Sequence, residues 1–326
     1  MPLSFVINPL FDTPLEKLKT YTGSNPKPVD FDSFWDNKLN QLDNINPQVE
    51  IIQSKFQTSF AECFDLYFTS TQNARIHAKL IQPKQHQSQT PAIIMFHGYT
   101  GSSSDWSEKL AFAAEGFTVA ALDCRGQGGS SQDVGGTVGG TMRGHIIRGL
   151  EGHPNDMLFT QIFLDTALLT RIVMDMPSVN PERVGVTGRS QGGGLSLACA
   201  SLVPEIKLAA PVYPFLSDYK RVWEIDQAKD AYFELQEYFR KVDPLHLNED
   251  EVFTKLGYID IQNLTPRIKG DVMMGIGLMD TITPPSTQFA AYNKISSNKK
   301  YVLYPDFGHE KLPGYEDMIF EFMRSL

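Results

Sequence analysis

From about residue 76 onward, short apolar runs rich in β-branched residues alternate with longer stretches in which apolar residues recur at helical spacing. Such short runs are typical of buried strands, and the longer stretches are typical of helices. The expected strands are Ile76–Ile81, Ala92–Phe96, Thr118–Leu122, Val184–Thr187, Leu208–Val212, Asp271–Leu278 and Tyr301–Tyr304. The expected helices are Trp106–Ala114, Leu158–Met174, Gln191–Leu202, Ser286–Ile295 and Tyr315–Ser325. This alternation predicts an α/β fold with a mostly parallel central sheet and helices on both faces.

Three segments do not follow this alternation. Residues 1–50 are polar and contain prolines, with one amphipathic stretch at Phe31–Leu42 that predicts a helix, so we interpret them as an N-terminal extension. Residues 126–152 hold 10 of the 25 glycines, and a loop this long is usually functional or interfacial. Residues 213–264 are rich in aromatic side chains and lie between two strands, which favours a helical cap insert. We interpret residues 1–326 as a single domain built around one sheet.

Composition excludes several classes of protein. The 326 residues are 41% hydrophobic and 21% charged, which is enough for a sizeable core. The net charge of −9 argues against nucleic-acid partners and against an anionic membrane surface, because both require a basic face. No apolar run approaches the ~18 residues that span a bilayer, and the first residues do not resemble a signal peptide, so we expect a cytoplasmic protein. Cys63, Cys124 and Cys199 are widely spaced, which favours buried thiols over a disulfide framework or a metal site.

The sequence Gly188-Arg189-Ser190-Gln191-Gly192 follows an expected strand and opens an expected helix. In this context GxSxG is typical of a nucleophile elbow, a strained turn that exposes a serine hydroxyl. Gly188 and Gly192 lack a Cβ, so the helix can approach the strand closely. Free N–H groups at the start of the helix, that of Gln191 above all, can stabilise an oxyanion. Ser190 is therefore the candidate nucleophile.

A serine hydroxyl needs a base, and the base needs an orienting acid. In enzymes with a nucleophile elbow, the acid and then the histidine follow the serine along the chain. Only His246 and His309 follow Ser190. His309 comes shortly after an expected strand, whereas His246 lies within the insert. We therefore expect His309 to be the base and His246 to be a solvated surface residue.

The candidate acid is Asp280, which ends an apolar strand at the edge of the sheet where α/β active sites form. Asp218, which follows an earlier strand, is the alternative. Asp306 lies closer to His309 in sequence, and we expect it to shape the turn that carries the histidine.

The second oxyanion donor is expected in the loop after an early strand. His97-Gly98-Tyr99 follows the strand that ends at Phe96. We expect the backbone N–H of Tyr99 to be the donor, with Gly98 allowing the tight turn and His97 as a structural hydrogen-bonding residue. No glycine pattern of a dinucleotide or phosphate site is present, and no cofactor or metal is expected.

Three motifs resemble the RGQ, GxSQG and HE signatures of carbohydrate esterase family 7, namely Arg125-Gly126-Gln127, Gly188–Gly192 and His309-Glu310. The likeness continues in order through FDSFW, HGY, SQGGGL, GLMDTITPPST, FAAYN and YPDFGHE, so it covers nearly the whole chain. The family contains acetyl xylan esterases and cephalosporin C deacetylases. The resemblance implies an α/β-hydrolase fold with Ser190 as nucleophile, His309 as base, Asp280 as its partner, and Tyr99 and Gln191 as oxyanion donors. It also implies that Arg125 and Gln127 hold the loop beside the site.

By this resemblance the protein is a serine esterase that removes acetyl groups from xylooligosaccharides and related small esters, including cephalosporin C. The alternative is a broader short-chain carboxylesterase with a non-carbohydrate natural substrate. A non-catalytic relative would normally have lost a triad residue, and none is missing here. Tyr213 and Pro214 lie just after a strand end, where we expect them to bind substrate together with Tyr99. The resemblance further implies a homohexamer, a dimer of trimers whose sites face an internal cavity, with residues 126–152 packed against a neighbour.

Overall fold

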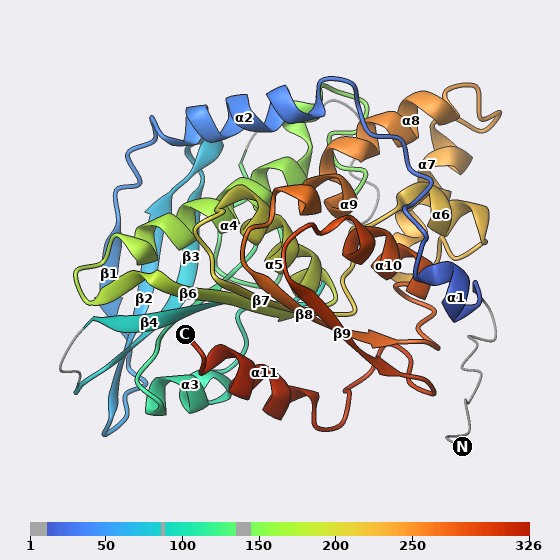
Figure 1. Ribbon diagram of the computed structural model, residues 1–326. Coiled ribbons are helices and arrows are strands. Elements are labelled where there is room, and N and C mark those ends of the chain that lie inside the picture. The colour runs from blue at the N-terminus through green and yellow to red at the C-terminus, as the bar shows by residue number, and fades with distance from the viewer. Residues whose placement is uncertain (1–11, 86–88, 135–144) are drawn as a thin grey trace, which may run out of the picture.

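A central sheet runs through the protein, for which we describe a computed structural model over residues 12–85, 89–134 and 145–326 (Figure 1). Residues 135–144 of the expected glycine-rich loop and residues 1–11 of the expected extension lie outside the described residues. The strands are β1 (Glu50–Gln53), β2 (Ala61–Thr69), β3 (Arg75–Pro83), β4 (Thr90–Phe96), β5 (Thr118–Leu122), β6 (Val179–Arg189), β7 (Leu208–Val212), β8 (Asp271–Gly277) and β9 (Lys299–Tyr304).

The strand order across the sheet is β1-β2-β3-β5-β4-β6-β7-β8-β9. The first three strands pair in antiparallel fashion, and β3 is also antiparallel to β5. From β5 across to β9 every neighbouring pair is parallel. The mostly parallel sheet expected from the sequence is thus confirmed, and the carboxyl ends of β4 and β6 to β9 meet along one edge.

Helices cover both faces of this sheet, as expected. Figure 1 shows α3 and α11 on one face, and α4, α5 and α10 on the other. The helices are α1 (Leu15–Leu18), α2 (Phe31–Leu42), α3 (Leu110–Ala114), α4 (Leu158–Met174), α5 (Gln191–Leu202), α6 (Tyr219–Glu224), α7 (Phe233–Lys241), α8 (Glu249–Leu256), α9 (Ile261–Leu264), α10 (Pro285–Lys294) and α11 (Tyr315–Met323). None of these helices combines the length and the apolar character needed to cross a membrane.

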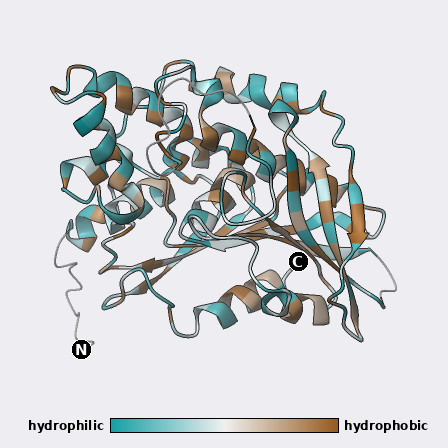
Figure 2. Cartoon of the chain, turned by 180° about the vertical axis from the view of Figure 1, so that it is seen from behind, coloured by the Kyte–Doolittle hydropathy of each residue, from teal (hydrophilic) through white to brown (hydrophobic). Residues whose placement is uncertain are grey.

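Alternating side chains of the strands build one core on each face of the sheet. In β4, Ile94 packs into the core beneath α4 and α5, whereas its neighbour Ile93 packs with Phe112 of α3 and Ile319 of α11. Figure 2 shows the central strands coloured mainly hydrophobic between helices in which hydrophilic and hydrophobic residues alternate. Strands buried on both faces have no polar side, which explains why they read as continuous apolar runs in the sequence.

The strands β1 and β2 were not expected, and the reason is physical. All four residues of β1 are exposed, so this edge strand carries no periodic apolar signal. In β2 the buried face changes along the strand, because Ala61 and Cys63 pack in the core on one side of the sheet and Leu66 and Phe68 pack in the core on the other. A second difference is smaller: the helix expected at Trp106–Ala114 begins as a 3-10 turn and becomes α-helical only at Leu110.

The N-terminal extension lies against the helical insert. The carboxylate of Asp218, just before α6, accepts the backbone N–H groups of Ser24 (3.0 Å) and Asn25 (2.8 Å) and the hydroxyl of Tyr21 (2.7 Å). These bonds satisfy a carboxylate that is itself fully buried. The extension is therefore joined to the insert by polar contacts as well as by apolar packing.

A buried ion pair fixes the chain just beyond β5. The guanidinium of Arg125 makes two hydrogen bonds to the carboxylate of Asp165 on α4, of 2.7 Å and 2.6 Å, and neither side chain is exposed. The hydroxyl of Ser70 donates to the same carboxylate. Removing one partner of such a pair leaves an uncompensated buried charge, which is far more costly than losing a surface pair.

We predict that Arg125→Met lowers the free energy of unfolding by about 3–5 kcal/mol. The matched control is Arg171→Met, which removes the half-exposed pair of Arg171 with Asp43; its expected effect is below ~1 kcal/mol. Urea denaturation of both variants at one protein concentration measures the difference. Equal midpoints for the two variants would show that the Arg125 pair does not hold the fold together.

Candidate active site

Ser190 occupies a sharp turn between β6 and α5. Its backbone has φ 55° and ψ −118°, a left-handed conformation that a non-glycine residue adopts only when its surroundings impose it. The Ser190 N–H donates to the carbonyl of Val212 (3.0 Å), and the Ser190 carbonyl accepts the N–H of Phe215 (2.9 Å). These bonds to the end of β7 hold the turn in place.

Close packing around the turn requires glycine at position 192. A Cβ added at Gly192 would lie 2.1 Å from the carbonyl oxygen of Phe96 at the end of β4. A Cβ added at Gly188 would lie 2.6 Å from the same oxygen. The two glycines therefore let β4, β6 and α5 approach one another closely, as the elbow pattern predicts.

His309 and Asp280 are brought together at the same edge of the sheet. They lie in the loops after β9 and β8, and Nδ1 of His309 is 2.8 Å from Oδ2 of Asp280. The Asp280 side chain is fully buried and accepts the N–H groups of Ile282 (2.9 Å) and Thr283 (2.8 Å). An ionised carboxylate can only accept, so this network assigns the ring proton to Nδ1 and leaves Nε2 as an acceptor.

The alternative residues have other partners. Asp218 is bonded to the N-terminal extension, as described above, and Asp306 is exposed. His246 is exposed in the insert, where it pairs with Glu249 (3.0 Å). The structure therefore favours Asp280 and His309 over these three residues as members of one site.

The Tyr213 side chain packs against the ring of His309. Its ring centroid is 4.5 Å from that of His309, and its N–H donates to the carbonyl of Gly275 in β8 (2.8 Å). Because Tyr213 directly follows Val212, which binds Ser190, the chain after β7 links the serine to the histidine. The following residue, Pro214, is buried beside α5.

Gln191, one of the expected oxyanion donors, is the first residue of α5, where its N–H has no partner within the helix. Its side-chain amide pairs in both directions with that of Gln127, at 2.7 Å and 3.0 Å. This pairing ties the start of the glycine-rich segment to the start of the nucleophile helix. Gln127 thus holds the loop beside Ser190, in the place that the RGQ motif suggested.

The loop after β4 carries Tyr99, the other expected donor. The N–H of Cys124 donates to Nε2 of His97 (3.0 Å), and Nδ1 of His97 lies 2.7 Å from the carbonyl of Gly98. Burial lowers the pKa of His97, so its ring stays neutral, as an acceptor nitrogen requires. The expectation that Gly98 is needed for a tight turn is wrong: its φ is not left-handed, and an added Cβ would meet no atom within 4 Å among the described residues.

The phenol of Tyr99 donates a 2.5 Å hydrogen bond to Glu234 of α7, which the sequence analysis did not single out. Glu234 is only 3% exposed. Its signal in the sequence was weak but present: it precedes Tyr238 by four residues and therefore shares the buried face of its helix. An acid on an apolar helix face indicates a specific partner.

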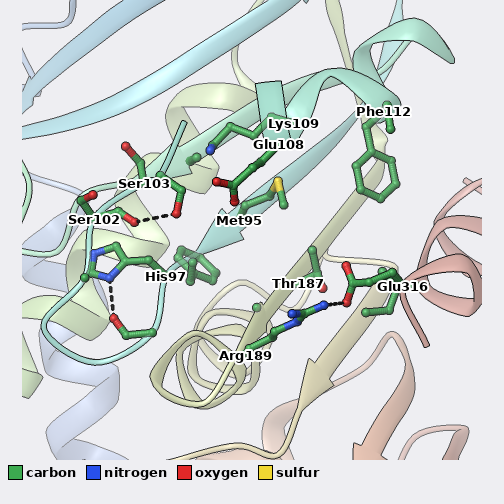
Figure 3. A pocket seen from close by; sticks show the side chains of 18 of the residues that line it. Met95, His97, Ser102, Ser103, Glu108, Lys109, Phe112, Thr187, Arg189 and Glu316 are labelled. Atoms are coloured by element: carbon green, nitrogen blue, oxygen red, sulfur yellow. Dashed lines mark hydrogen bonds and ion pairs between the residues drawn. The ribbon is translucent and has the colours of Figure 1, made fainter. Parts of the chain in front are cut away.

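A cavity of about 830 Å³ lies on the α3 and α11 side of the elbow (Figure 3). Its walls include His97, Thr187 and Arg189, but neither Ser190 nor His309. Arg189 is the variable residue of the elbow, and it forms an ion pair with Glu316 of α11. Gly98 and Tyr99 also line the cavity, so it borders the elbow and the loop after β4 without including the candidate nucleophile or base. Across the described ranges no three His, Cys, Asp or Glu side chains gather closely enough to hold a metal ion.

A parallel sheet with helices on both faces, a serine at a left-handed strand-to-helix turn and a His–Asp pair after the last two strands define the α/β-hydrolase class. The model of the acetyl xylan esterase family (AXE1) matches residues 8–326. The chain therefore belongs to the acetyl xylan esterase family, carbohydrate esterase family 7.

Solved structures and one curated relative agree with this assignment. Acetyl xylan esterase 1 from Thermoanaerobacterium sp. JW/SL YS485 is 58% identical, with a TM-score of 0.95 over 97% of this chain and 99% of that one. Acetyl xylan esterase from Paenibacillus sp. R4 is 34% identical, with a TM-score of 0.92 over 96% and 99%. Acetyl esterase Axe7A from Xylanibacter ruminicola is 24% identical over 89% of this chain, which spans 64% of the length of that relative.

We predict that Gly192→Ala destabilises the elbow and lowers esterase activity at least ~100-fold, because misplacing a reacting group by about 1 Å can cost this much. Gly98→Ala is the control, since a Cβ there meets no described atom, and its activity should stay within about threefold of the wild type. Hydrolysis of p-nitrophenyl acetate and thermal unfolding of both variants measure the effect. Wild-type activity in folded Gly192→Ala would contradict the close-packing argument.

Proposed function

We propose that the protein is a serine esterase that removes acetyl groups from acetylated xylooligosaccharides and other small acetyl esters, including cephalosporin C. The observation that carries this proposal is the Asp280–His309 pair at the same edge of the sheet as the left-handed turn at Ser190, in a chain of the acetyl xylan esterase family. Relatives named as acetyl xylan esterases support the substrate class.

In the proposed reaction Ser190 Oγ attacks the ester carbonyl while Nε2 of His309 takes its proton. Asp280 stabilises the imidazolium that forms, and the N–H groups of Tyr99 and Gln191 donate to the oxyanion. His309 then protonates the leaving alcohol, which departs as the C–O bond breaks and the acetyl-enzyme remains. A water molecule, deprotonated by His309, then attacks the acetyl-enzyme; the bond from the acetyl carbon to Ser190 Oγ breaks, His309 returns the proton to Ser190, and acetate is released.

Residues after β7 support a short acyl pocket. Tyr213 is 5% exposed and contacts the His309 ring, and Pro214 is buried beside the nucleophile helix. We propose that Tyr213, Pro214 and Tyr99 bind the acyl group in a space that suits acetate. A close-packed wall admits longer chains only with strain. The leaving alcohol lies outside this wall, which allows both a sugar and a cephalosporin as leaving group.

We propose that the chain assembles as a homohexamer, a dimer of trimers, and one feature of the surface supports association with another chain. The edge strand β1 leaves Ile51 and Ile52 exposed at 47% and 46%, and Phe56 and Phe60 nearby in the chain are also exposed. An exposed edge strand with apolar side chains is typical of a surface that pairs with another chain. If the sites face an enclosed cavity, small oligomers reach them and polymeric xylan does not.

The catalytic assignment predicts a hierarchy of rates. Ser190→Ala should lower kcat on the order of 10⁶-fold, because the nucleophile is lost. Asp280→Asn should cost up to ~10⁴-fold, because the imidazole loses its orienting carboxylate. Asp306→Asn, an exposed residue in the same loop as His309, is the control and should match the wild type. A normal rate in Asp280→Asn together with an inactive Asp218→Asn would overturn the assignment of the acid.

The substrate assignment predicts discrimination on both sides of the ester. At equal acetyl concentration, acetate release should be comparable for acetylated xylotriose and cephalosporin C and far slower for polymeric acetyl xylan. Octanoate esters should react much more slowly than acetate esters, because one excess methylene alone costs about 1–3 kcal/mol in such a pocket. Equal rates on the polymer and the trimer would contradict enclosed sites. High activity on octanoate with none on sugar acetates would favour the broader carboxylesterase.

A further inference from the structure

Three segments that are far apart in the sequence meet at the carboxylate of Glu234. This residue lies in the first turn of α7, within the helical insert. Its Oε1 accepts the phenol proton of Tyr99, from the loop after β4 (2.5 Å). Its Oε2 accepts the N–H groups of Ile146 (2.9 Å) and Ile147 (3.3 Å), at the end of the glycine-rich segment.

The Tyr99 side chain is half-buried, and its hydroxyl and its ring both have partners in the structure. Besides donating to Glu234, its hydroxyl accepts the N–H of His145 (2.9 Å). The His145 ring meets the Tyr99 ring edge-on at 5.4 Å, and the Phe215 ring lies 5.2 Å away. The backbone around Tyr99 forms a turn in which the N–H of Gly101 donates to the carbonyl of Gly98 (3.0 Å) and the hydroxyl of Thr100 donates to the carbonyl of Tyr99 (2.7 Å). The direction of the Tyr99 N–H is therefore set by this turn together with the anchoring of the Tyr99 side chain.

We propose that Glu234 is a positioning residue for the esterase reaction, which orients the Tyr99 N–H toward the oxyanion by holding the Tyr99 phenol. The proposal rests on the proposed function, in which that N–H stabilises the transition state. Glu234 acts through Tyr99 and touches no reacting atom.

The chemistry of the contact is unusual for a purely structural role. The three donors to the carboxylate are all neutral, so its burial is not compensated by a cation among the contacts described. The pKa of Glu234 is raised to about 8, chiefly by burial and to a smaller extent by the nearby Glu237, although the hydrogen bonds from Tyr99 and the two N–H groups lower it. An apolar side chain would join α7 to the sheet at lower cost, but it could not fix the phenol in one orientation.

The test compares Glu234→Gln, Tyr99→Phe and the double variant. An N–H that points in the wrong direction stabilises the transition state less, whereas it affects substrate binding little. We therefore expect kcat for p-nitrophenyl acetate to fall on the order of 10- to 100-fold, which is less than the ~10²–10³-fold loss expected when a donor is absent. KM should change less than about threefold. The double variant should be no slower than the slower single variant, because both substitutions break the same contact.

A second measurement separates positioning from folding. Trifluoroacetone adds to the serine as a tetrahedral adduct whose oxygen occupies the oxyanion site, so its inhibition constant should rise by the same factor as kcat falls. Glu237→Gln, one turn later on the same helix and also buried, is the matched control and should keep the wild-type kcat and inhibition constant. If Glu234→Gln does not fold, kcat and the inhibition constant of Tyr99→Phe alone test the proposal, since that substitution removes only the hydroxyl.

A folded Glu234→Gln or Tyr99→Phe with wild-type kcat would overturn the proposal. So would losses of kcat that multiply in the double variant, because the two residues would then act independently. Failure of the proposed function would look different: the wild type itself would not hydrolyse acetyl esters, or Ser190→Ala would remain active.

Discussion

The left-handed backbone at Ser190 must be held against a cost of about 1–3 kcal/mol, and much of the surrounding structure serves to hold it. Hydrogen bonds to the carbonyl of Val212 and from the N–H of Phe215 fix the turn to the end of β7. On the other side, Gly192 lets α5 approach the carbonyl of Phe96 at the end of β4. The turn is thus set by two neighbouring strands. The parallel sheet matters to the site because it brings those two strand ends to the same edge.

The loops at this edge are fixed by buried polar groups more than by apolar packing. Asp123, just after β5, accepts the N–H groups of Ser103 (2.6 Å) and Ser130 (2.9 Å) and pairs with His77 (2.6 Å). One carboxylate thereby joins the Tyr99 loop to the start of the glycine-rich segment. Loops cannot bury their backbone groups without such partners, so each acid at this edge determines where a loop can lie.

The sequence predicts the layers well and the polar connections poorly, for a physical reason. Strands such as β5 and helices such as α4 are buried along their length, so their apolar runs give their bounds directly. The position of Asp280 after a buried strand and of His309 after the next already placed them at one edge. Glu234 could not be found in this way, because its partners lie 135 and 88 residues away in the chain. The edge strand β1 was missed because an exposed strand needs no apolar pattern.

Buried acidic side chains of the helical insert form hydrogen bonds to two other parts of the chain. The insert therefore does more than cover the sheet. Asp218 joins it to the N-terminal extension, and Glu234 joins it to the Tyr99 loop. Within the insert, the N–H of Asp218 donates to Asp260, whose pKa is raised to about 7 by burial and by the nearby Asp218. Buried carboxylates with few cations tolerate only the arrangement that supplies all their donors. An insert fixed in this way is bonded directly to Tyr99, so in the proposed reaction the geometry of the oxyanion site would depend on the insert as well as on the elbow.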